Sequence, residues 1–268
     1  ISDGKIDDIR FDGVACTIST ASTSIMSELL KGKTTEEAKE IMDNKAQAGL
    51  VLTAEYSDLW KEDKKTETNE VMFALQHSAK HKIASNYGKS YYPSDYSPNA
   101  GWADYYGNED FFKAYPNDDR KEWNYMTEWK IKSGEIIPYT ESADKLPAIS
   151  KYYDYDEGAP GKSAQSNGIT CIYRYAEVLL MYAEASTRAT NSVNQDALNA
   201  IQEVQKRAGY QDRQIELTTT TEPTAFLAAV SNERGWEFFA EMKRWFELVR
   251  LEKVKEVRAE EWDASTFN

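Results

Sequence analysis

The chain has 268 residues and a formal net charge of −13 at pH 7, with 45 Asp and Glu against 32 Lys and Arg. Such an acidic surface repels phosphate backbones and no basic cluster offsets it, so nucleic acid is excluded as an expected partner. No run approaches the roughly 18 to 20 apolar residues that a membrane helix needs, and the length suffices for a substantial core.

Two helices are expected near the N-terminus. Residues 17–30 carry apolar and small side chains at helical spacing. A second helix begins at a capping box, in which Thr34 is the N-cap and Glu37 stands three residues later. Packed against each other, they predict a tetratricopeptide-like helical hairpin over residues 1–60.

Residues 61–170 are predicted to be an irregular, loop-rich segment. The apolar run at 71–75 has the length of a strand, although a buried helical turn would look the same. Short strands are also expected within 123–131 and 152–155. Between them, residues 85–102 combine many tyrosines with Gly, Pro, Asn and Asp, a density of turn residues that forbids a long helix.

Residues 171–268 are predicted to be helical again. Residues 174–185 form an amphipathic stripe, and after a polar turn Asn194 caps a second helix that ends at Gly209. Two helices joined by so short a turn predict another tetratricopeptide-like hairpin. A third helical stretch, 224–257, is expected to be bent or broken.

The break is expected near Gly235 or Met242. The same stretch carries three glutamates at i, i+4 and i+8, which could serve as a metal or general-acid site or could pair with arginines inside the fold. The second interpretation is favoured because no histidine joins them. These glutamates are Glu233, Glu237 and Glu241, and the expected partners are Arg174, Arg244 and Arg250.

Other reactive residues carry weak signals. His77 and His81 have i, i+4 spacing, but no Glu of a zincin helix lies between them, so a solvated or core-edge pair is favoured over a zinc site. Cys16 and Cys171 are expected to be buried free thiols, with a disulfide as the alternative. No nucleophile elbow, phosphate loop or catalytic triad occurs, so we expect no enzyme activity, no cofactor and no metal.

Several motifs, taken in order, resemble the SusD/RagB family. The stretch 174–185 agrees almost letter for letter with the family's RYAEVLLMYAEA-like helix. The 233–250 stretch resembles its E-R-x-x-E-x-x-x-E-G-x-R-W helix, with Met242 in place of Gly and Glu247 in place of Asp. Residues 202–209 resemble the family's N-x-V-R-x-R-A-G-like helix end, with Gln202 and Gln205 in place of Asn and Arg. Weaker similarities occur at 56–60, 69–73 and 117–120.

The resemblance implies a mostly α-helical fold of tetratricopeptide-like hairpins that support a long irregular segment with a few short strands. It implies a non-catalytic surface lipoprotein of the bacterial outer membrane that delivers oligosaccharide or polysaccharide to a SusC-like TonB-dependent transporter. Family members are usually longer and begin with a lipoprotein signal. Residues 1–5 are no signal peptide and Cys16 sits in no lipobox, so the chain is expected to be a fragment without the lipid anchor. The alternatives are a binder of peptides or another nutrient and, less favoured, a secreted glycan hydrolase.

The aromatic loop is the expected binding site. Sugar rings present flat C–H faces that stack on aromatic rings, while their hydroxyls reach polar side chains at the edges. The competing interpretation is that these tyrosines pack inward to hold the loop together. The candidate ligand-binding residues are Tyr91, Tyr92, Tyr96, Asn99, Trp102, Tyr105 and Tyr106.

Overall fold

The computed structural model describes residue 44 and residues 49–61, 63–78, 80–97, 100–152, 167–209 and 216–257. The helices expected at 17–30 and from Thr34 onward therefore lie outside the described residues, and the hairpin predicted for 1–60 is not tested. In chain order the elements are η1 (Tyr56–Leu59), β1 (Val71–Gln76), α3 (Tyr87–Tyr91), α4 (Glu109–Ala114), α5 (Asp119–Asn124), β2 (Tyr125–Met126), β3 (Glu128–Lys130), β4 (Ile136–Pro138), η2 (Tyr139–Glu141), β5 (Ala148–Ile149), β6 (Ile169–Arg174), α6 (Tyr175–Thr190), α7 (Gln195–Ala208), α8 (Pro223–Glu237), α9 (Arg244–Arg250) and α10 (Val254–Val257).

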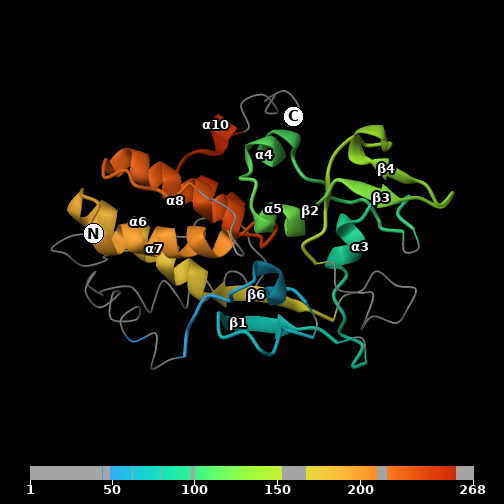
Figure 1. Ribbon diagram of the computed structural model, residues 1–268, viewed down its shortest axis with the longest axis horizontal. Helices are drawn as coiled ribbons and strands as arrows, with labels where there is room; N and C mark the ends of the chain where they lie inside the picture. The colour runs from blue at the N-terminus through green and yellow to red at the C-terminus, as the bar shows by residue number, and fades with distance from the viewer. Residues whose placement is uncertain are drawn as a thin grey trace, which may run out of the picture.

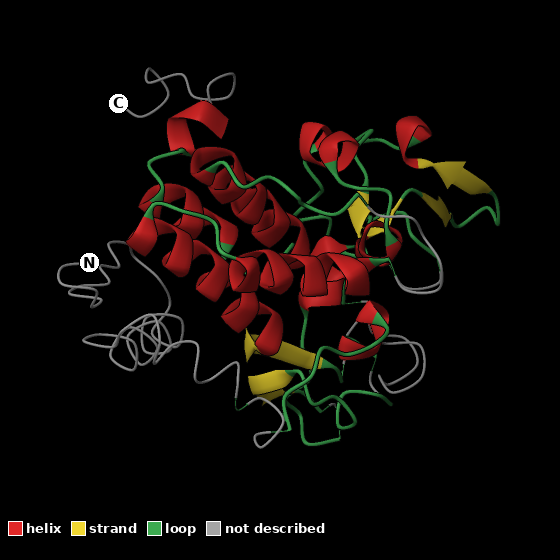
Figure 2. Ribbon diagram, turned by 60° about the vertical axis from the view of Figure 1, so that its left-hand side comes forward, coloured by secondary structure: helices red, strands yellow, loops and turns green. Residues whose placement is uncertain are grey.

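Three helices, α6, α7 and α8, form the main helical layer, with the β3–β4 ribbon on the other side of the molecule (Figure 1). Helix α6 ends at Asn191, whose φ of 49° is left-handed, and α7 begins where the Asn194 side chain accepts a hydrogen bond from the Ala197 amide at 2.8 Å. The short turn between these two caps makes α6 and α7 a hairpin. The tetratricopeptide-like hairpin and the mostly helical fold are confirmed (Figure 2).

One apolar core joins the three helices. Each helix contributes side chains that are almost fully buried, and this burial is the main favourable term in their association. These side chains include Tyr175, Leu179, Leu180, Ile201, Val204, Phe226 and Val230. Among the described residues, no helix is both long and apolar enough to cross a membrane.

The third helical stretch is broken, as expected. Helix α8 ends at Glu237 and α9 begins at Arg244, and the connection contains two non-glycine residues with positive φ, Ala240 at 57° and Met242 at 61°. The break therefore includes Met242, whereas Gly235 lies inside α8.

The described residues contain three two-stranded antiparallel ribbons: β1–β6, β2–β5 and β3–β4. The apolar run at 71–75 is thus a strand, paired so that Phe73 faces Tyr173. The expected strands within 123–131 are β2 and β3, preceded by the end of α5. Of the strand expected at 152–155, Tyr152 lies in a turn and the rest falls outside the described part of the chain.

A buried ionic cluster connects the helical layer to the middle of the chain. The Arg174 side chain, fully buried, donates to Glu70 at 2.7 Å, to Glu241 at 2.8 and 3.1 Å, and to Glu237. Arg120 donates to Glu237 at 2.9 Å as well as to Asp118 and Glu233, Arg207 reaches Glu70 and Glu237, and Lys151 reaches Glu241 at 2.7 Å.

The pairing predicted for the three glutamates is confirmed for Arg174 and wrong for the other two arginines. Arg244 pairs instead with Glu247 at 3.1 Å, and Arg250 with Glu184 at 2.6 and 2.9 Å. The other partners come from helices α5 and α7 and from the segment after β5. Sequence spacing within one helix carries no information on which other helix will face it.

Candidate functional site

Helix α3 and the loop that follows it form a compact aromatic surface. The loop returns along the helix, where the Trp102 amide donates to the Lys89 carbonyl at 2.6 Å and the Asp104 amide to the Ser90 carbonyl at 2.9 Å. Gly101 makes this approach possible, because a Cβ built on it would lie only 1.9 Å from the Tyr92 carbonyl oxygen. The backbone of the loop is therefore held in place by α3.

Four rings gather around α3, and we call them the aromatic platform: Tyr87, Tyr91, Trp102 and Tyr105. The centroid of the Tyr91 ring lies 6.4 Å from that of Tyr87 and 5.8 Å from that of Tyr105. Trp102 and Tyr105 are 52% and 61% exposed, so part of each ring is accessible to a ligand. Tyr91 is half-buried, and its ring stacks on Tyr152 at 6.0 Å.

The platform also includes a cation, the Lys89 ammonium, and a protonated hydroxyl group, that of Tyr91. The Lys89 ammonium lies 5.3 Å from the centre of the Trp102 ring, a cation–π distance. Burial, with smaller contributions from Tyr87 and Tyr105, raises the pKa of Tyr91 to about 12. Its hydroxyl group therefore stays protonated at neutral pH.

Two of the residues expected in the binding site take other positions. Tyr92 is fully buried, with its ring edge-on to Tyr96 at 4.9 Å, so it has no free face and leaves the set of candidates. Gly101 also packs closely against the backbone of Tyr92. Tyr106 is half-buried and donates to Asp144 at 2.6 Å; burial and the charge of Asp144 raise its pKa. Asn99 lies outside the described residues.

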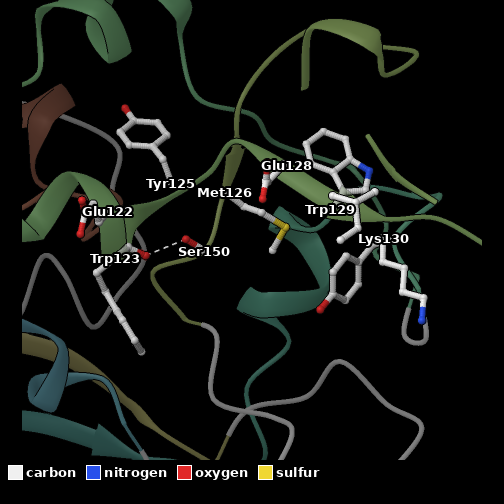
Figure 3. A pocket seen from close by; sticks show the side chains of 10 residues that line it. Glu122, Trp123, Tyr125, Met126, Glu128, Trp129, Lys130 and Ser150 are labelled. Carbon is white, nitrogen blue, oxygen red and sulfur yellow. Dashed lines mark hydrogen bonds between the residues drawn. The ribbon is translucent and has the colours of Figure 1, made fainter. Parts of the chain in front are cut away.

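Tyr96 faces a separate cavity of about 440 Å³ beside β2, β3 and β5 (Figure 3). The segment that carries Tyr96 is pinned to the β3–β4 ribbon, because Trp129 donates its indole N–H to Asp95 at 2.9 Å and the Ser97 amide donates to the Lys130 carbonyl at 2.8 Å. A volume of this size falls in the range of roughly 300–1,000 Å³ that small-molecule pockets span. The other lining residues are Glu122, Trp123, Tyr125, Met126, Glu128, Trp129, Lys130, Ile136 and Ser150.

Sequence reasoning missed Trp123 and Trp129 as lining residues of this cavity. Both belong to the stretch expected to form short strands, where an aromatic side chain is most often a packing residue. Their exposure differs: Trp129 is buried, whereas Trp123 is half-buried and donates its indole N–H to the Lys151 carbonyl at 3.0 Å. The available signal was the run of aromatic residues within 123–129.

The structure describes three of the four reactive residues singled out above, His77, His81 and Cys171. His77 uses both ring nitrogens, one against the Ile83 carbonyl at 3.1 Å and the other against the Thr170 hydroxyl at 2.7 Å, and burial lowers its pKa. Cys171 is a buried free thiol, whereas Cys16 lies outside the described residues. Within the described residues, no group of three His, Cys, Asp or Glu side chains could hold a metal ion.

Comparison with known families gives two matches along the chain. Residues 124–266 match the sequence model of the SusD family, and residues 1–69 match that of the NifU-like N terminal domain. The second similarity was not anticipated from the sequence patterns, which favoured a tetratricopeptide-like hairpin there. Most of residues 1–69 lie outside the described part of the chain.

Two curated proteins are similar to the chain, one along most of its length and one over a short stretch. SusD-like protein P2 of Formosa agariphila is 26% identical over 276 residues, which cover 94% of this chain and 54% of that protein. Iron-sulfur cluster assembly scaffold protein IscU of Streptococcus pyogenes is 54% identical over 39 residues, covering 15% of this chain and 24% of that protein. The chain therefore spans about half the length of the SusD-like relative.

Solved structures show the same fold. A SusD superfamily protein from Parabacteroides distasonis superimposes with a TM-score of 0.64 at 23% identity, covering 80% of this chain and 46% of that one. A SusD-like carbohydrate binding protein from Bacteroides fragilis gives a TM-score of 0.66 at 20% identity, over 82% and 49% of the two chains. Surface glycan-binding protein A from Bacteroides thetaiotaomicron, solved in complex with laminarihexaose, gives 0.59 at 21% identity, over 90% and 52%.

Proposed function

Because the chain belongs to the SusD family, we propose that it binds nutrient oligosaccharide without catalysis and delivers it to a SusC-like TonB-dependent transporter at the bacterial outer membrane. One structural neighbour is a surface glycan-binding protein in complex with laminarihexaose, and this supports a glycan as the ligand. Since this chain spans about half of its SusD-like relative, a longer protein could add further contacts to the same ligand.

The observation that carries this proposal is the aromatic platform. Trp102 and Tyr105 offer more than half of their surface to solvent, on a loop whose backbone is hydrogen-bonded to α3. Rings held in this way lose little conformational entropy when a sugar stacks on them. The side chains of Lys89 and Asp104 belong to the same surface and would accept or donate hydrogen bonds at the edges of the sugar.

The mechanism is reversible capture. The C–H face of a pyranose stacks on Trp102 or Tyr105. The ligand dissociates and is transferred when the transporter presents a site that binds it more tightly. In this proposal the helical layer of α6, α7 and α8 faces the transporter. The full-length protein would be held at the cell surface by a lipid anchor.

Replacing Trp102 or Tyr105 with alanine is expected to weaken glycan binding by about 1 kcal/mol or more each, because each change removes a stacking face. The measurement is calorimetry or affinity electrophoresis with maltohexaose, cellohexaose, laminarihexaose and their parent polysaccharides. Phe73→Ala on β1 is the matched control, since this ring is 48% exposed but lies outside the platform. If all three variants bind with the same affinity as the parent protein, the platform is not part of the binding site. Tyr92→Ala, in contrast, would test folding and not binding.

Two rival functions give different results in the same experiments. A binder of peptides would retain affinity for peptide libraries after Trp102→Ala and would not bind the glycan panel. A glycan hydrolase would release new reducing ends when incubated with the polysaccharides. Any release that depends on the protein refutes non-catalytic capture.

A further inference from the structure

Met242 occupies a backbone conformation that suits glycine and not methionine. Its φ of 61° lies in the left-handed region, where a Cβ crowds the following carbonyl oxygen. A methionine in a backbone conformation that only glycine adopts without strain requires an explanation.

Packing in the core does not explain it. The Met242 side chain is 50% exposed, so it contributes little buried apolar surface. Its sulfur lies 3.9 Å from the hydroxyl oxygen of Tyr87, at the edge of the aromatic platform.

Met242 lies at the Tyr87 end of a series of neighbouring rings. From Tyr105 to Tyr91 the ring centroids are 5.8 Å apart, from Tyr91 to Tyr87 they are 6.4 Å apart, and the thioether of Met242 continues from the hydroxyl end of Tyr87. The row thus passes from the loop of residues 100–105, over α3, to the connection between α8 and α9. A thioether is apolar, flexible and polarizable, which suits contact with the C–H face of a sugar.

We propose that Met242 is a ligand-contacting residue, and that the ligand is an oligosaccharide long enough to lie along the row from Tyr105 to Met242. This inference rests on the proposed function. It adds a contact outside the aromatic loop and assigns the substrate class as an extended chain, since a single sugar ring on Trp102 or Tyr105 would not reach Met242. The strained backbone positions the side chain at the end of the row.

The test separates strain from binding. Met242→Gly is expected to raise the melting temperature, because it relieves the left-handed backbone, and to weaken binding of the best hexasaccharide of the panel by about threefold to tenfold. Binding of the corresponding disaccharide is expected to stay unchanged. Met242→Leu, which keeps an apolar side chain at the same φ, should bind the hexasaccharide within about twofold of the parent protein.

Ala240→Gly is the matched control, because Ala240 also has positive φ, 57°, in the same connection and carries only a methyl group. It should leave the affinity unchanged. If Met242→Gly gains thermal stability and keeps full affinity while Trp102→Ala loses affinity, the residue is structural and this inference is wrong although the proposed function stands. If the parent protein binds no glycan of the panel, both are wrong.

Discussion

Replacing Arg174 with methionine is expected to lower the free energy of unfolding by about 3–5 kcal/mol. The guanidinium is fully buried and donates to three carboxylates, those of Glu70, Glu237 and Glu241. Methionine fills a similar volume but removes the cation that these three carboxylates share. Arg207, Arg120 and Lys151 remain as partners, but the buried cluster is left with more excess negative charge, which costs far more than an ion pair contributes. Urea unfolding followed by tryptophan fluorescence measures the change.

Arg188→Met is the control for this prediction. Arg188 forms a comparable ion pair, 2.8 Å from Glu184, but its side chain is 45% exposed, so its loss is expected to cost under about 1 kcal/mol. Should Arg174→Met fail to fold, Lys151→Met gives a graded test, because Glu241 then keeps Arg174 as a partner and the expected loss is about 1–3 kcal/mol. Equal losses for Arg174→Met and Arg188→Met would show that burial of the cluster has no energetic role.

Lowering the pH is expected to reduce the free energy of unfolding through Glu184, whose ion pair with Arg250 connects α6 to α9. Burial by itself raises the pKa of this carboxyl, but the hydrogen bonds and charge of Arg250, together with Arg234 and Arg188, outweigh it and lower the pKa from 4.5 to about 2. A group whose pKa is lower in the folded state than in the unfolded state stabilises the fold at pH values above its unfolded-state pKa. Its contribution is therefore complete above about pH 5 and is lost as the pH falls toward 2.

The drop in pKa from 4.5 to about 2 corresponds to about 3 kcal/mol as an upper limit, because Arg250 is partly exposed to solvent. Glu184→Gln should therefore be less stable than the parent protein by up to about that amount at pH 7, and the difference should shrink toward zero near pH 2. Guanidinium titrations at pH 7, 4, 3 and 2.5 measure it. Glu67→Gln, which breaks the exposed pair with Lys64, serves as control, with an expected effect under about 1 kcal/mol throughout. A Glu184→Gln difference that is the same at pH 7 and pH 2.5 would falsify the assignment.

Glu237 also contributes to the loss of stability at low pH, whereas Glu233 acts in the opposite direction. Burial would raise the pKa of Glu237, but Arg207, Arg174 and Arg120 outweigh burial and hold it well below the usual range. For Glu233 burial dominates over its contact with Arg120, so its pKa is raised. Comparing Glu184→Gln with the parent protein cancels both contributions, which is why the difference between the two proteins is the quantity to measure.

The helical part of the fold could be predicted because its signals are local. Asn194 caps α7 through its own side chain, and the apolar spacing of α6 identifies the face that packs against α7 and α8. The strand at 71–75 could not be separated from a helical turn by the same means. Its identity depends on pairing with β6, about a hundred residues later in the chain.

The sequence alone determined the family and the helical hairpin of α6 and α7, and it predicted the loop that carries the binding surface. It could do so because capping, periodicity and turn residues act between neighbours in the chain. The tertiary structure alone decided which rings of that loop face outward. Tyr92 and Tyr105 are both tyrosines among turn residues, yet one lies beneath Gly101 and the other in solvent. The same holds for the partners of Glu237 and for the position of Met242 beside Tyr87. These contacts join residues distant in sequence, and they exist only once the helices, the ribbons and the loop have packed together.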